Sequence, residues 1–128
     1  MDKAQKGRTG EDFACNVLSK KGYRILARNY HSRYGEIDII AENDSRLAFV
    51  EVKARNKKST SMPRDAVDIR KQKKIIFTAM LYLQENRAQK PPQFDVFEVW
   101  HSESGIINFN HLENVFDLSA LGGDYELF

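Results

Sequence analysis

Two apolar runs joined by a short polar turn constrain the fold of this 128-residue chain more than any other feature. The runs read "GEIDIIAE" and "RLAFVEVKAR", and the residues between them, Asn43-Asp44-Ser45-Arg46, have a composition typical of β-hairpin turns. Apolar residues occupy both faces of each run, so both strands should be buried on each side. We therefore expect a buried antiparallel hairpin in which the few charged side chains need a special reason to be present.

The turn sets which side chains of this hairpin face each other. A two-residue turn at positions 44–45 is the commonest hairpin connection. In that register Asp38 lies opposite Glu51, and Glu36 lies opposite Lys53. Because side chains alternate along a strand, Asp38, Glu51 and Lys53 then share one face of the sheet. The Cβ atoms of the two opposed acids would be ~4.5–5.5 Å apart.

Opposed buried carboxylates repel each other, and a divalent cation between Asp38 and Glu51 would remove the repulsion. Mg²⁺ prefers one or two carboxylates, keeps several waters and takes further ligands from phosphate oxygens. Lys53 would then stabilise charge on a scissile phosphate or favour deprotonation of the attacking water. The structural alternative is a plain cross-strand ion pair of Lys53 with Asp38 or Glu36, and this spacing also arises by chance.

Two helices are expected around the hairpin. The first runs from about Thr9 to Lys21, ends at Gly22, and carries Glu11 on or next to its packing stripe. The second begins near residue 66 or 68, continues to Glu85 and is closed by Lys90-Pro91-Pro92. Its expected apolar stripe consists of Ile69, Ile76, Met80 and Leu83.

Further strands are expected at residues 23–30, 94–100 and 106–110, whereas residues 111–118 fit either a short helix or an extended segment. The resulting order is αβββαββ, with hairpins and one parallel crossover. This order predicts an α/β fold with a central mixed β-sheet flanked by helices. The whole chain, residues 1–128, is expected to form a single domain, with a flexible basic loop at residues 55–65.

Composition narrows the class of protein. The hydrophobic content of 41% and charged content of 30% are ordinary for a soluble globular domain. No apolar run approaches the ~20 residues of a membrane span, and the N-terminal residues do not resemble a signal peptide. The single cysteine, Cys15, predicts no internal disulfide, and the sparse histidines argue against a zinc site. A cytoplasmic location is expected.

Charge is distributed unevenly along the chain. Residues 53–74 contain nine Lys or Arg against two Asp, while residues 91–128 contain seven acids and no Lys or Arg. A basic middle and an acidic tail suggest a polyanionic partner, although a solvated loop and helix face would have the same charges. Gln72 lies on the stripe of the second helix, where it either joins a site or caps a backbone group. Candidate phosphate contacts, each also compatible with ordinary surface, are Arg8, Arg28, His31, Arg33, Arg55, Lys71, Lys73 and Lys74.

The segments "GRTGEDFACNVLSKKGYRILARNY", "GEIDIIAENDSRLAFVEVKAR" and "AVDIRKQKKI" resemble the YraN-type family of small bacterial proteins, described as endonuclease-like. The resemblance runs from about residue 7 to residue 100, with "GEID" and "FVEVK" as its most specific parts. That family is similar to archaeal Holliday-junction resolvases and to the PD-(D/E)xK nuclease superfamily. The resemblance therefore implies a restriction-endonuclease-like core and Mg²⁺- or Mn²⁺-dependent phosphodiester hydrolysis.

The resemblance also implies roles for individual residues. Asp38 and Glu51 match the motif acids, Lys53 matches the motif lysine, Glu11 matches the acid of the first helix, and Gln72 matches a helix glutamine of some members. Two positions depart from the superfamily pattern, since Ile37 stands where a proline is frequent and Ala54 where a threonine is usual.

Two functions from different classes follow. The first is a nuclease acting on DNA, with branched or structured DNA favoured; Asp38, Glu51 and Glu11 would hold the metal. If four-way junctions are the substrate, two symmetric cuts require a homodimer. The second is a non-catalytic nucleic-acid-binding or adaptor module with the same fold. In a third and weaker reading, the acidic tail docks a partner within a DNA repair or uptake complex.

Overall fold

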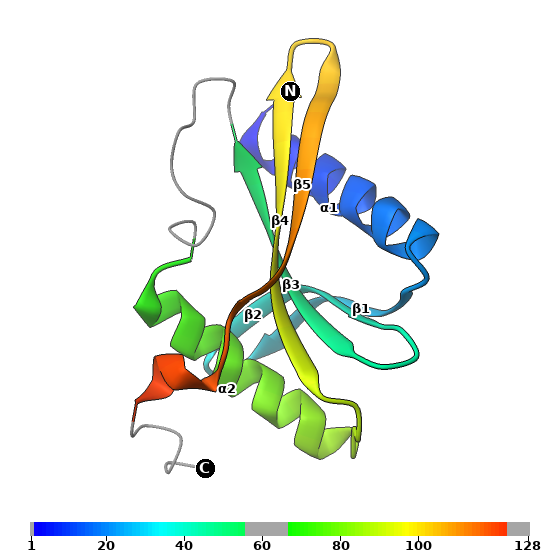
Figure 1. The fold of residues 1–128 in the computed structure, drawn as a ribbon. Coiled ribbons are helices and arrows are strands. Elements are labelled where there is room, and N and C mark those ends of the chain that lie inside the picture. Colours follow the sequence, from blue (N-terminus) through cyan, green and yellow to red (C-terminus); the bar gives the residue numbers. More distant parts are fainter. Residues whose placement is uncertain (1, 56–66, 123–128) are drawn as a thin grey trace.

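The computed structural model describes residues 2–55 and 67–122. The predicted loop at residues 55–65 therefore lies outside the described residues, except for Arg55. Within the described part, the chain folds into a mixed sheet with a helix on each face (Figure 1). Its elements are α1 (Lys3–Lys20), β1 (Arg24–Ser32), β2 (Gly35–Glu42), β3 (Leu47–Arg55), α2 (Ile69–Glu85), β4 (Pro92–Ser102) and β5 (Gly105–Phe116), followed by a 3-10 turn (Leu118–Leu121).

The strands lie side by side in chain order, β1-β2-β3-β4-β5. Neighbours are antiparallel except β3 and β4, which are parallel because α2 carries the chain back across the sheet. The predicted order αβββαββ and the single parallel crossover are confirmed, and they are consistent with a restriction-endonuclease-like core. No helix in the described part of the chain is long and apolar enough to cross a membrane.

The hairpin turn between β2 and β3 forms as the sequence predicts. Asn43 N–H donates to the Arg46 carbonyl at 3.0 Å, so residues 44–45 are the two-residue loop. The Asn43 side chain also accepts hydrogen bonds from the backbone N–H groups of Ser45 and Arg46. These bonds fix the turn, and the pairs from Glu42↔Leu47 to Ile39↔Val50 follow the expected register.

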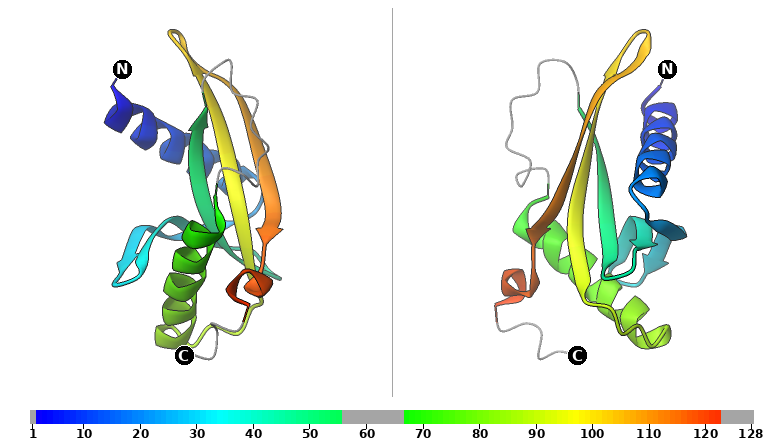
Figure 2. Two further views of the ribbon diagram at one scale, coloured as in Figure 1. Left: turned by 90° about the vertical axis from the view of Figure 1, so that its left-hand side faces the viewer. Right: turned by 45° about the vertical axis from the view of Figure 1, so that its right-hand side comes forward.

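Each helix covers one face of the sheet with its own hydrophobic cluster, and Figure 2 shows the helices on opposite sides. Ala14 and Leu18 of α1 pack against Ile39, Ala41, Val50, Phe97 and Val99, while Ile75 and Ile76 of α2 pack against Ile40, Phe49, Phe94 and Val96. β3 and β4 contribute to both clusters, which explains why their sequences are apolar on both faces.

Three local expectations need correction. α1 begins at Lys3 rather than Thr9, because Asp2 and Gln5 form a capping box at its start. Ile69 is 56% exposed, since it is the first residue of α2 and lies off the buried stripe. Ile37 packs in the α2 cluster and not beside Ile39, so the strict alternation expected for β2 fails next to Asp38. Of the two alternatives for residues 111–118, the extended one holds as far as Phe116.

Candidate metal centre and nucleic-acid cleft

Asp38 and Glu51 lie where β2 and β3 separate. In the expected register they would follow Ile39↔Val50, but that is the last pair of the ladder, so the predicted pairs Asp38–Glu51 and Glu36–Lys53 do not form. Beyond the last pair, the Val52 N–H donates to Asp38 Oδ2 at 2.8 Å and so does not extend the ladder. Figure 2 shows the β1–β2 hairpin turning away from β3. The acids thus lie at a fork in the sheet, which α1 covers on one face and α2 on the other.

Both acids are buried, with 9% of Asp38 and 8% of Glu51 exposed. Burial, followed by the charge of Glu51, raises the pKa of Asp38 to about 7, although the Val52 N–H and the charge of Lys71 act in the opposite direction. A carboxylate in this position is ionised only at a considerable cost, because its neighbour has the same charge and little water reaches it. This environment favours a cation.

α1 brings a third carboxylate to the fork. Its Gly10 lies against the sheet, where an added methyl group would be in van der Waals contact with Val52 at 3.5 Å. The next residue, Glu11, has a side chain only 15% exposed, and burial followed by the charge of Asp38 raises its pKa. Arg28 lies 3.6 Å from Glu11 but 2.7 Å from Asp12, so its charge is shared between them.

Asn29, which the sequence reading did not single out, supports Glu11 from β1. It adopts a left-handed backbone conformation with φ of 52°, and it falls between the pairs Arg28↔Ile39 and Tyr30↔Ile37, across from Asp38. Its side chain forms a hydrogen bond with Glu11. Asparagine tolerates this conformation better than most residues, but nothing in an alternating strand pattern marks where such a kink occurs.

Lys71 approaches the acids from the other face. The side chain of Asp68 caps α2 by accepting from the Lys71 N–H at 2.8 Å. From this first turn, Lys71 Nζ donates to Glu51 Oε1 at 2.5 Å. Burial lowers the pKa of the Lys71 amine, but the bond and charge of Glu51, together with the charges of Asp38 and Glu36, outweigh it and raise that pKa. Sequence reasoning placed Lys71 at a phosphate and missed this partner.

The other predicted residues of this face lie along β3 and α2. Lys53 is half-buried, two residues beyond Glu51 on the same strand. Gln72 donates from Nε2 to the Val67 carbonyl at 2.8 Å, which is the backbone-capping role that the sequence left open. Arg55 is almost fully buried in an ion pair, with Nε 2.9 Å from Glu98 Oε2, and its Nη2 atom has no partner among the described residues.

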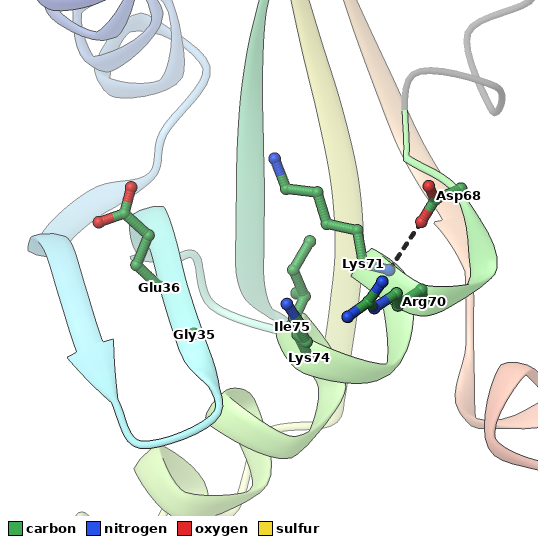
Figure 3. Close-up of a pocket in the computed structure, with 7 residues that line it drawn as sticks. All are labelled: Gly35, Glu36, Asp68, Arg70, Lys71, Lys74 and Ile75. Atoms are coloured by element: carbon green, nitrogen blue, oxygen red, sulfur yellow. Dashed lines mark hydrogen bonds between the residues drawn. The ribbon is translucent and has the colours of Figure 1, made fainter.

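A cleft opens beside the acids, between the β1–β2 hairpin and the start of α2 (Figure 3). Its volume is about 500 Å³. Gly35 and Glu36 line it from β2, and the α2 side contributes Asp68, Arg70, Lys71, Lys74 and Ile75.

The remaining predicted phosphate contacts lie apart from this cleft or have partners of their own. Arg33, in the β1–β2 turn, stacks on Tyr34 at 5.0 Å from the ring centroid and donates to its hydroxyl. Arg8 is exposed on α1, and His31 lies 3.3 Å from Glu36. Lys73 is half-buried on α2.

Glu11, Asp38 and Glu51 do not form the tightest group of potential ligands in the described residues. That group is Asp95, His111 and Glu113, whose ligand atoms all lie within 4.8 Å of one another. It lies on the face covered by α1, next to Tyr23, and Tyr23 donates from its hydroxyl to Glu113 at 3.2 Å. The sequence reading missed it, although Asp95 in the apolar run "FDVFEV" was a signal of a buried acid.

Within this second group, hydrogen bonds from neighbouring residues already satisfy the carboxylate of Asp95. His111 Nε2 donates to Asp95 Oδ2 at 2.8 Å while its Nδ1 accepts from the Lys21 ammonium, and Asn114 N–H donates to Asp95 Oδ1 at 2.9 Å. Gln93 Nε2 adds a bond to Oδ2 at 2.9 Å. A carboxylate with this many donors is a structural anchor between β4 and β5 and needs no cation.

Comparison with known proteins agrees with the sequence resemblance. A model of the uncharacterised protein family UPF0102 matches residues 10–99. A UPF0102 protein of Caldanaerobacter subterraneus is 40% identical over 119 residues, covering 91% of this chain and 98% of the relative. Relatives of the same description from Lachnoclostridium phytofermentans and Clostridioides difficile are 44% and 42% identical, each over 91% of this chain and over 97% and 100% of their own length.

Proposed function

The chain belongs to the uncharacterised protein family UPF0102, and we propose that it is a metal-dependent nuclease that hydrolyses phosphodiester bonds of DNA. One observation carries the proposal: Asp38 and Glu51 are buried next to each other at the fork between β2 and β3, with Lys53 following on β3. Structural ion pairs place opposite charges together. At this site Lys71 pairs with Glu51, but Asp38 still has the like charge of Glu51 beside it, and a bound cation would relieve that repulsion.

The donor set fits Mg²⁺ or Mn²⁺. Asp38 and Glu51 would hold the ion through hard carboxylate oxygens, and Glu11 would act beside them, directly or through a water. When bound, such an ion supplies an activated water and neutralises charge that develops on the phosphate. Lys53 would add a positive charge next to the reacting phosphate from a half-buried position, where it acts more strongly than in bulk water.

The cleft beside the acids supports a nucleic-acid substrate. Arg70, Lys71 and Lys74 line one wall of it, at the positive end of α2, so a phosphodiester backbone laid there would reach the acids. Branched or structured DNA and a homodimer suited to paired cuts belong to this proposal because the family resemblance points to junction resolvases. Partners in DNA repair or uptake, suggested by the acidic tail, and a cytoplasmic location, suggested by the composition, belong to it as well.

A non-catalytic nucleic-acid-binding or adaptor module is the second candidate. Two observations favour it: Glu51 already has Lys71 as a partner, and Glu11, Asp38 and Glu51 do not gather within 4.8 Å as the Asp95 group does in the described residues. In this case the cleft would bind DNA, and the buried acids would serve only the structure next to it.

Cleavage of a panel of four-way junction, flap, single-stranded and linear DNAs with Mg²⁺ or Mn²⁺ separates the candidates. Wild type is compared with Asp38→Asn and Lys53→Ala, and with Asp44→Asn as a matched control in the exposed hairpin turn. The nuclease predicts cutting by wild type and the control, and retained binding without cutting by the two site variants. Equal binding with no cutting by any protein supports the adaptor, and binding that does not weaken with salt rules out DNA as the partner.

A further inference from the structure

The ion pair between Lys71 and Glu51 lies where a metal would need to bind. Lys71 Nζ is 2.5 Å from Glu51 Oε1, and the Glu51 side chain is 9% exposed, whereas that of Lys71 is 49% exposed. The ammonium is also close enough to Asp38 and Glu36 for their charges to act on it. One flexible lysine thus supplies positive charge to both acids of the fork.

The backbone of Lys71 is fixed while its side chain can turn. Asp68 accepts from the Lys71 N–H, and Ile75 and Ile76 anchor the same turns of α2 in the core. Figure 3 shows the Lys71 side chain extending along β3, away from Lys74. Because half of that side chain is exposed at the cleft, the amine can leave Glu51 by bond rotation alone, without moving the helix.

Two cations cannot share Glu51 without cost. An ammonium on Oε1 occupies a lone pair that a metal would use, and it repels a divalent ion bound between Glu51 and Asp38. Lys71 is a compact point charge on a flexible chain, so it can exchange one anionic partner for another. The cleft that it lines offers the alternative position, beside Arg70 and Lys74.

We propose that Lys71 is an internal counter-cation of the site, which a bound divalent metal displaces from Glu51 into the cleft, where it binds a phosphate oxygen of the DNA. The inference rests on the proposed metal site and adds its regulation. Lys71 holds the acids together before the metal arrives, and the metal then makes Lys71 available to the substrate. Metal and DNA binding are therefore coupled, and by linkage each tightens the other.

Metal binding without DNA tests the displacement directly. Mn²⁺ is titrated calorimetrically into wild type, Lys71→Met and Lys71→Arg, with Lys74→Met as a control that removes a charge from the same cleft. Lys71→Met should bind Mn²⁺ about three- to fivefold more tightly than wild type, which is the upper part of the range for an exposed ion pair. Lys74→Met should stay within about twofold and Lys71→Arg should resemble wild type, because a guanidinium can still pair with Glu51.

A second measurement follows the coupling. Binding of a fluorescent oligonucleotide is compared with and without Ca²⁺, and the gain in affinity on adding Ca²⁺ should be smaller for Lys71→Met than for Lys74→Met. If Lys71→Met binds Mn²⁺ no more tightly than wild type, or keeps the full Ca²⁺ gain, the displacement is wrong while the metal site stands. If wild type binds no Mn²⁺, or binds it equally after Asp38→Asn, the metal-dependent function fails as well.

Discussion

Replacing Asp38 by asparagine should stabilise the metal-free protein while destroying the metal site. The carboxylate is buried beside Glu51 and its pKa is raised to about 7, which means that the folded state resists its ionisation. Asparagine has nearly the same shape, has no charge, and keeps an oxygen that can accept the Val52 N–H bond. The substitution therefore removes the electrostatic penalty and little else.

The pKa sets the size and the pH range of this effect. The folded state holds the Asp38 proton up to about pH 7, whereas the unfolded chain releases it near the ordinary value of 3.8. Wild type therefore loses stability as pH rises between these values, by about 1.4 kcal/mol for each pH unit. At pH 8 the full penalty applies, so Asp38→Asn should be more stable by about 4 kcal/mol, while near pH 4 the two proteins should be alike.

Urea unfolding at pH 4.5, 6 and 8 in the presence of EDTA measures this difference, with Asp44→Asn as the control for the same substitution at an exposed turn position. A saturating concentration of Mn²⁺ should then stabilise wild type, by about 2.7 kcal/mol at 100 times its Kd, but not Asp38→Asn. If Asp38→Asn is no more stable than wild type at pH 8, Asp38 is not penalised in the folded state. The electrostatic argument for a cation site would then be wrong.

Two further substitutions test buried charges outside the fork. Glu98→Gln should cost about 3–5 kcal/mol of unfolding free energy, because it leaves the Arg55 guanidinium buried without its counter-charge. Glu103→Gln, in the exposed β4–β5 turn, is the control. A cost below about 1 kcal/mol for Glu98→Gln would contradict the buried pair. Asp95→Asn should lower the free energy of unfolding by about 2–3 kcal/mol, because an amide cannot accept all the hydrogen bonds that the carboxylate accepts. Thermal unfolding of the variant that matches wild type would contradict the anchoring role.

The hairpin at the centre of the site could be predicted because local chemistry determines it. Asn43 binds two backbone N–H groups of its own turn, so the loop length and the register of β2 against β3 follow from adjacent residues. The parallel β3–β4 pair was also accessible, since a helix of this length between two apolar strands makes a crossover.

The details that shape the site depend on tertiary contacts. A strict period of two does not predict that Ile37 changes face. Nor does it predict that only the part of β2 from Ile39 onward pairs with β3. It also does not predict the left-handed conformation of Asn29, whose side chain interacts with Glu11 on another element. Lys71 could not be assigned to Glu51 because a four-carbon side chain reaches many partners, and only the position of α2 selects one.

Asp38 and Asp95 show why burial alone does not identify a functional acid. Each accepts a backbone N–H where a strand ladder is interrupted: Asp38 binds Val52 after the last β2–β3 pair, and Asp95 binds Asn114 at the irregularity between β4 and β5. The difference lies in the other contacts. Asp95 has His111 and Gln93 as donors, whereas Asp38 has a second buried carboxylate beside it. Removing the charge should therefore destabilise the protein at position 95 and stabilise it at position 38, and only the second outcome is expected of an acid kept for a cation.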